Sequence, residues 1–102
     1  SKVTNISINA FENCTKLSAI EIPKTVKSIE GNVFAGCTSI KSIIIPEGVT
    51  WIYQNAFSGW TKDQIIYVEN LPEAPSGWYN IKYNWTWLDG SEATVVWNYK
   101  PE

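Results

Sequence analysis

The chain has 102 residues, of which 44% are apolar, and its formal net charge of −2 is reached without a single arginine. This charge argues against nucleic-acid binding, which needs a basic surface to neutralise phosphates. No run of 18 apolar residues is present, so no membrane insertion is expected. The sequence also lacks histidine, the commonest general base and zinc ligand, and we expect neither a cofactor nor a metal.

The sequence repeats itself with a period of 23 residues. Residues 1–23 and 24–46 share nine identities, and residues 24–46 and 47–69 share seven. Unrelated segments would share roughly one or two, so the period predicts a repeat architecture. The aligned positions include a phenylalanine column and an asparagine column: Phe11, Phe34 and Phe57; Asn9, Asn32 and Asn55.

The segment Leu17–Pro23 reads L-x-x-I-x-I-P and predicts a short strand. Side chains alternate along a strand, so Ile20 and Ile22 share one face, while Leu17 turns inward at the corner. Pro23 ends the strand because proline has no N–H to donate. Repeats stacked about 4.8 Å apart would pair these strands into a parallel sheet.

Each repeat continues with V-x-x-I, as in Val26 and Ile29, and then with N-x-F-x-x-C. The V-x-x-I segments predict a second short ladder on the opposite side of the repeat. The asparagine predicts a tight turn with a single helical or 3₁₀ turn, because its side chain bonds nearby backbone. We interpret the phenylalanine column as core between the two ladders.

The whole pattern, L-x-x-I-x-I-P-x-x-V-x-x-I-x-x-N-A-F-x-x-C, resembles the BspA-type leucine-rich repeat of surface proteins from anaerobic bacteria and some protist parasites. The resemblance covers about residues 3–68. Three later segments resemble the region that often follows the last such repeat: Ile66–Glu69, Pro75–Trp78 and Val95–Trp97. The resemblance implies a right-handed leucine-rich-repeat solenoid, mostly β, exported to the bacterial cell surface or secreted and serving adhesion.

We expect two regions. Residues 1–68 form about three repeats, the first one partial, and residues 69–102 form a C-terminal β cap. The boundary is placed where Asp63 and Glu69 replace the leucine and the proline of the repeat. The cap is expected to hold an aromatic-rich loop, a turn at Asp89–Gly90 and a final strand over 94–97 that joins the sheet.

The first repeat has no cap on its outer side. We therefore expect further repeats upstream in a longer parent protein, since the chain contains no methionine to start translation and shows no signal peptide. In isolation, this uncapped N-terminal end predicts dimerisation or a frayed end.

Cys14 and Cys37 fall in one column, with Cα atoms expected about 5 Å apart. Their parallel Cβ directions suit a disulfide poorly, so buried free thiols are the favoured interpretation. A disulfide and metal or redox chemistry are the alternatives.

The sequence does not indicate an enzyme. A thiol dyad requires a histidine, no glycine-rich phosphate loop is present, and no spacing among the two aspartates and eight glutamates points to a catalytic carboxylate pair.

Two surfaces are candidates for binding. The first is the outward side of the parallel sheet, whose alternative role is ordinary cross-strand packing or contact with the cap. Its candidate residues are Glu21, Lys41, Ile44, Gln64, Ile65 and Tyr67. The second is a set of cap aromatics that could stack on sugars or, as the alternative, plug the end of the stack: Trp78, Trp85 and Trp87. Trp51 and Tyr53 fall at outward positions of the second ladder and are a minor candidate for contacts.

The sequence thus predicts a non-enzymatic binding or adhesion module of a bacterial secreted or cell-surface protein, with a host or matrix protein as partner. The alternatives are a carbohydrate-binding module that uses the cap aromatics and a purely structural spacer.

Overall fold

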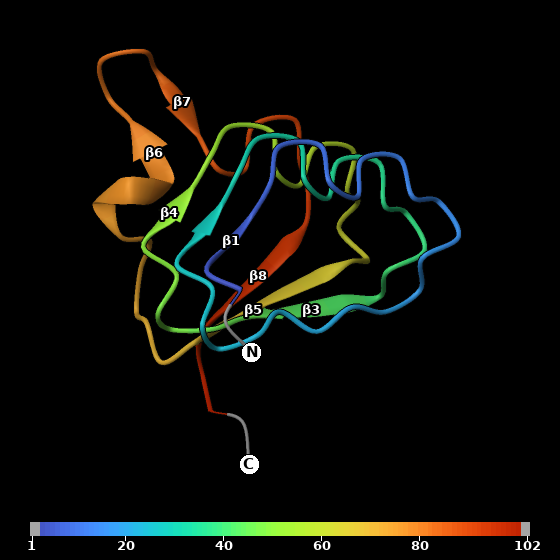
Figure 1. Cartoon of the computed structure of the whole chain (residues 1–102), viewed down its shortest axis with the longest axis horizontal. Coiled ribbons are helices and arrows are strands. Elements are labelled where there is room, and N and C mark those ends of the chain that lie inside the picture. Colours follow the sequence, from blue (N-terminus) through green and yellow to red (C-terminus); the bar gives the residue numbers. More distant parts are fainter. Residues whose placement is uncertain (1–2, 101–102) are drawn as a thin grey trace.

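The computed structural model describes residues 3–100, whose successive segments are joined by two parallel ladders (Figure 1). For reference, the chain is divided into segments called coils that follow the 23-residue period. We call residues 3–23 coil 1, 24–46 coil 2, 47–69 coil 3 and 70–100 coil 4. The strands are β1 (Asn5–Ile6), β2 (Ser28–Ile29), β3 (Ser42–Ile45), β4 (Trp51–Ile52), β5 (Ile65–Glu69), β6 (Tyr79–Asn80), β7 (Trp85–Thr86) and β8 (Thr94–Tyr99), with one 3₁₀ helix, η1 (Ser76–Trp78).

Two parallel ladders run across the coils. Strands β1, β2 and β4 pair with Ile6 opposite Ile29 and Ile29 opposite Ile52, so the register follows the 23-residue period. Strands β3, β5 and β8 form the main sheet, in which Ile66 lies between its partners Ile43 and Val95. The predicted parallel sheet, the second ladder and the final strand are thereby confirmed.

Coil 1 departs from the prediction. Residues 17–23 form no strand, and no backbone hydrogen bond joins them to β3 within the described part of the chain. Coil 1 buries apolar side chains against coil 2 alone, so Leu17 and Ile20 are only half-buried. The departure is confined to this segment, because β1 of the same coil pairs with β2.

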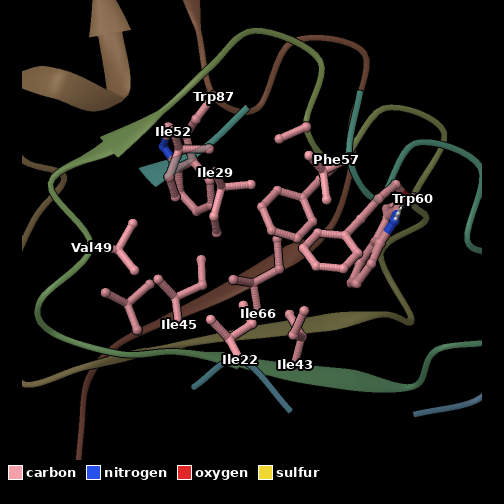
Figure 2. Packing of buried hydrophobic residues seen from close by; sticks show 14 of the residues in the cluster. Ile22, Ile29, Ile43, Ile45, Val49, Ile52, Phe57, Trp60, Ile66 and Trp87 are labelled. Carbon is pink, nitrogen blue, oxygen red and sulfur yellow. Dashed lines mark hydrogen bonds between the residues drawn. The ribbon is translucent and has the colours of Figure 1, made fainter. Parts of the chain in front are cut away.

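The core lies between the two ladders, and Figure 2 shows isoleucines from both sides pointing into it. The ring of Phe34 is stacked between Phe11 and Phe57, with centroid distances of 5.8 and 5.5 Å. Phe34 and Phe57 are fully buried, and burying such a side chain contributes roughly 1.5–3 kcal/mol. The interpretation of the phenylalanine column as core is confirmed.

The corner after each strand of the second ladder is set by an asparagine. Asn9, Asn32 and Asn55 have φ angles of 62°, 59° and 65°, in the left-handed region that asparagine tolerates better than other side chains. The reversal allows the backbone bonds between coils to continue beyond the strands, as from Phe34 N to Ala56 O (2.8 Å) and from Gly36 N to Ser58 O (2.9 Å).

Coil 4 keeps part of this pattern in the region predicted to be a cap. Trp78 N donates to Pro75 O (3.0 Å), as Val49 N does to Pro46 O (3.2 Å) in coil 3, so Trp78 takes the place of the valine. The antiparallel hairpin β6–β7 then replaces the ladder strand and protrudes from the stack (Figure 1).

The chain rejoins the stack after this hairpin. Trp87 N donates to Trp78 O (2.8 Å), and Gly59 N donates to Gly90 O (2.9 Å). Residues 1–2 of the predicted repeat region and residues 101–102 of the predicted cap lie outside the described residues. Within residues 3–100 no helix has the length and apolar character needed to traverse a bilayer.

Candidate functional site

A row of apolar side chains crosses the outward face of the main sheet. The register places Ile44 beside Tyr67 and Tyr67 beside Val96, one residue from each of the three strands. Their neighbours Ile43, Ile66 and Val95 point inward, because side chains alternate along a strand. Ile44 is 38% exposed and Val96 is 37% exposed. We call Ile44, Tyr67 and Val96 the outer apolar row.

The outer apolar row is supported at one side by a second tyrosine. The ring centroids of Tyr67 and Tyr99 lie 4.6 Å apart, with an angle of 40° between the ring planes. A second row beside it is mostly polar and consists of Ser42, Ile65 and Thr94. The face therefore has an apolar centre and a polar border.

Most residues predicted for this face lie on it or at its border. Ile44, Ile65 and Tyr67 share the face, and Lys41 is exposed immediately before β3. Glu21 is exposed in coil 1, within the segment that does not pair with β3. Sequence reasoning did not place Val96 and Tyr99 on this face. Both belong to β8, whose residues pair with those of β5 at a spacing that differs from the 23-residue period.

The expectation that Gln64 points outward is wrong. Its side chain is only 4% exposed, and Nε2 donates to Cys37 O (3.0 Å) and Ile40 O (2.9 Å), while Oε1 accepts from Thr61 N (3.0 Å). The period places Asp63 at the inward corner, but Asp63 is exposed. Gln64 fills the corner instead, because an amide satisfies these backbone groups and an ionised carboxylate would have to be desolvated there.

Three of the aromatic candidates do not offer an exposed stacking surface. Trp78, Trp85 and Trp87 are buried, and Trp78 Nε1 donates to Val49 O (3.2 Å). The ring centroid of Trp87 lies 4.9 Å from that of Trp78 and 5.8 Å from that of Phe57. Because indoles cover a large apolar area, Trp78 and Trp87 extend the core into coil 4.

The other two aromatic candidates remain accessible. Trp51 is 41% exposed and Tyr53 is 40% exposed, with their ring centroids 6.2 Å apart in a stacked arrangement. The rings of Tyr53 and Trp85 of the hairpin make a T-shaped contact, with centroids 4.8 Å apart. Trp51 is in β4 of the second ladder, and Tyr53 directly follows that strand.

Both cysteines are free thiols. Cys37 is buried and its Sγ donates to Phe11 O (3.0 Å), while Cys14 is half-buried. Burial raises the pKa of the Cys37 thiol above its ordinary value of 9.0, and the nearby Cys14 raises it further, although a backbone hydrogen bond from Cys14 opposes the shift. Within residues 3–100 no cluster of three or more potential ligands is placed to hold a metal ion.

We expect the Cys37 thiol to make the fold less stable at alkaline pH. The unfolded thiol ionises near 9.0, whereas the folded thiol has a raised pKa, so the unfolded chain releases its proton first. The contribution is fully present below pH 9.0 and is lost as the pH rises through the folded pKa. Urea unfolding between about pH 7 and about pH 10 should show a steeper loss for the native chain than for Cys37→Ala. Parallel curves would contradict this.

The chain was also compared with known proteins. The family model described as the BspA type leucine rich repeat region matches residues 1–85, in six copies. Neither the comparison with curated proteins nor the comparison with solved structures found a match. The matched region contains both ladders of coils 1 to 3 and the hairpin of coil 4 up to Trp85. The chain therefore belongs to the BspA-type leucine-rich-repeat family.

Proposed function

We propose that this chain is a non-enzymatic protein-interaction module of a bacterial surface or secreted protein, serving adhesion to a host or matrix protein. Membership of the family supports the coarser part of this proposal, since leucine-rich-repeat regions generally mediate protein contacts and BspA-type proteins are typically surface-associated. The single observation that carries the site is the outer apolar row on the main sheet.

The outer apolar row has the anatomy of a small interface. Tyrosine and isoleucine supply apolar area, and tyrosine has few rotamers to immobilise on binding. The three side chains stand on paired strands, so their spacing is fixed before a partner arrives. Lys41 and Glu21 lie at the border of the face, where charges favour encounter and specificity.

The test is binding of the folded chain to immobilised extracellular-matrix proteins. We expect saturable binding to one of them and a loss of about tenfold or more in affinity for Tyr67→Ala, the size typical of a central interface residue. Trp51→Ala, on the second ladder, is the matched aromatic control and should leave the affinity unchanged. Equal loss in both variants, or no retention of any matrix protein, would count against the proposed face.

A carbohydrate-binding role is the second candidate, and the exposed Trp51–Tyr53 stack supports it. Planar aromatic faces stack on sugar rings, and both side chains of this pair are exposed. A glycan array would then show a signal that disappears in Trp51→Ala and persists in Tyr67→Ala. Silence on both the array and the matrix panel would favour a structural spacer.

We further propose that the coils wind as a right-handed solenoid, that residues 69–102 close its C-terminal end, and that the open side of coil 1 accepts another coil. A hollow of about 320 Å³ supports the last point; it is lined partly by Ile6, Phe11 and Ile20. If two copies join at this end, sedimentation of the isolated chain should reveal a dimer. A strictly monomeric species would argue against such self-association.

A further inference from the structure

A second recessed surface separates coil 1 from the main sheet. It is a groove of about 810 Å³ bounded by residues 20–24 of coil 1 on one side and by β3 and Pro46 on the other. Glu69 of coil 3 also lines it. Apart from Ile44, it does not use the outer apolar row, so it offers a different kind of site.

The β3 side of this groove is an unpaired strand edge. Ile65 N donates to Lys41 O (3.0 Å), which fixes the parallel register between β3 and β5. In a parallel pair, alternate residues use their backbone groups on the same side. The N–H and C=O groups of Ser42 and Ile44 therefore point to the opposite edge, toward the groove. Within residues 3–100 no hydrogen bond occupies them.

The opposite wall is attached at both ends and unattached between them. At one end Ser39 Oγ donates to Thr15 O, and at the other end the chain passes directly through Pro23 and Lys24 into coil 2. Residues 18–22 make no backbone hydrogen bond to β3. The gap is therefore a defined feature between two anchored points.

A buried carboxylate gives the groove a charge. Glu69 is only 7% exposed, and its side chain has no hydrogen bond or ion pair with any residue of the described part of the chain. Every fully enclosed polar side-chain atom described does have a partner, so the Glu69 oxygens must reach solvent, and the groove is the opening they line. A carboxylate that no cation of the described chain pairs with is free to pair with the ammonium or guanidinium group of a partner.

Two other charged residues line the groove. Glu21 and Lys24 are both exposed, so their charges are well screened by water. Of the three charged residues that line the groove, Glu69 is the buried one, so its charge is the least screened by water. The floor contains Ile22 and Ile43 and is apolar.

We propose that this groove binds an extended polypeptide segment of a partner, which adds a strand to the free edge of β3 and places a lysine or arginine side chain against Glu69. Strand addition supplies backbone hydrogen bonds to Ser42 and Ile44, and the apolar floor accepts alternate side chains of the segment. Because β3 has four residues, the recognised segment is about four to six residues long.

The experiment uses the folded chain labelled with ¹⁵N and the capped probe peptide Thr-Val-Thr-Val-Thr-Lys. In the free protein, the amide hydrogens of Ser42 and Ile44 should exchange with solvent rapidly, whereas those of Ile43 and Ile45 should exchange slowly. Saturating peptide should slow exchange at Ser42 and Ile44 by about tenfold or more. Slow exchange at these amides in the free protein would show that residues 18–22 already cover the edge and would overturn the proposal.

Charge recognition is tested with Glu69→Gln, which keeps the shape of the side chain. We expect about fivefold or greater weakening for the lysine peptide, and no discrimination between it and a peptide ending in glutamate. Glu73→Gln, an exposed carboxylate outside the groove, should behave as the native chain does. No peptide binding at about 1 mM, or equal affinities in the native chain and Glu69→Gln, would overturn the site.

Two further variants separate this site from the outer apolar row. Ser42→Pro removes the N–H that faces the groove and leaves the bonds between β3 and β5 in place, so it should abolish peptide binding. Tyr67→Ala should leave peptide binding intact while it weakens binding to a matrix protein. The two proposals can therefore fail independently.

Discussion

Replacing Phe34 with alanine is expected to lower the free energy of unfolding by about 3–5 kcal/mol, the range for removing a buried phenylalanine side chain. The ring is fully buried and is stacked on both faces, by Phe11 and by Phe57. Its loss would leave a cavity in the middle of the column, and the anchored coils on either side cannot collapse into it. Urea unfolding followed by circular dichroism measures the change.

Phe11→Ala is the matched control for this prediction. Phe11 ends the same column in coil 1 and is only half-buried, so its removal should cost clearly less than that of Phe34. Because neighbouring coils stabilise one another, the Phe34 variant should lose structure in coils 1 to 3 together. Equal costs for Phe11→Ala and Phe34→Ala would show that the column does not act as a continuous core.

The second large effect is expected for Trp78→Ala, also about 3–5 kcal/mol. Trp78 is fully buried in coil 4, where its ring meets Trp87 and Trp97 with centroid distances of 4.9 and 6.2 Å. Its removal also deprives Val49 O of the donor Nε1. Urea unfolding, together with near-ultraviolet circular dichroism of the packed indoles, should report the loss.

Tyr83→Ala supplies the comparison for Trp78. Tyr83 lies in the same hairpin region but is 67% exposed, so its removal should change the free energy of unfolding by less than about 0.5 kcal/mol. If Trp78→Ala were as mild as Tyr83→Ala, coil 4 would contribute little to the core, and the description of its tryptophans as a plug would be untenable.

The repeat made much of this fold predictable. The period assigns Ile29 and Ile52 to one ladder, Ile43 and Ile66 to the other, and Phe34 to the space between them, and the structure has them there. Periodic sequences are readable in this way because each repeat occupies the same environment as its neighbours.

The sequence-based predictions fail at positions whose environment differs from that of the matching position in the neighbouring repeats. Coil 1 lies at one end of the described stack, and its L-x-x-I-x-I segment does not become a strand although β1 in the same coil does. At the third corner, Gln64 replaces the expected inward side chain because its amide bonds two backbone carbonyls, a choice that the period cannot reveal. In coil 4, the positions of Trp78 and Trp87 depend on a hairpin with no counterpart in the other coils.

The candidate sites follow the same division. Ile44 and Tyr67 could be placed on the outward face from alternation alone, but Val96 required the register of β8. The groove beside β3 could not be anticipated, because it exists only where coil 1 fails to pair. Glu69 was visible in the sequence as a departure from the repeat, yet the period gives no sign that its side chain is buried.

The hairpin of coil 4 has a consequence for how such proteins can be altered. The chain leaves the stack after Trp78 and returns to it at Trp87, where Trp87 N donates to Trp78 O. Residues 81–84 at the tip of the hairpin are all exposed. Lengthening a loop whose ends are already held together costs only about 0.6 kcal/mol for each doubling of its length. The tip is therefore a natural grafting position, where a foreign epitope could be displayed while the tryptophans beneath it keep the scaffold folded.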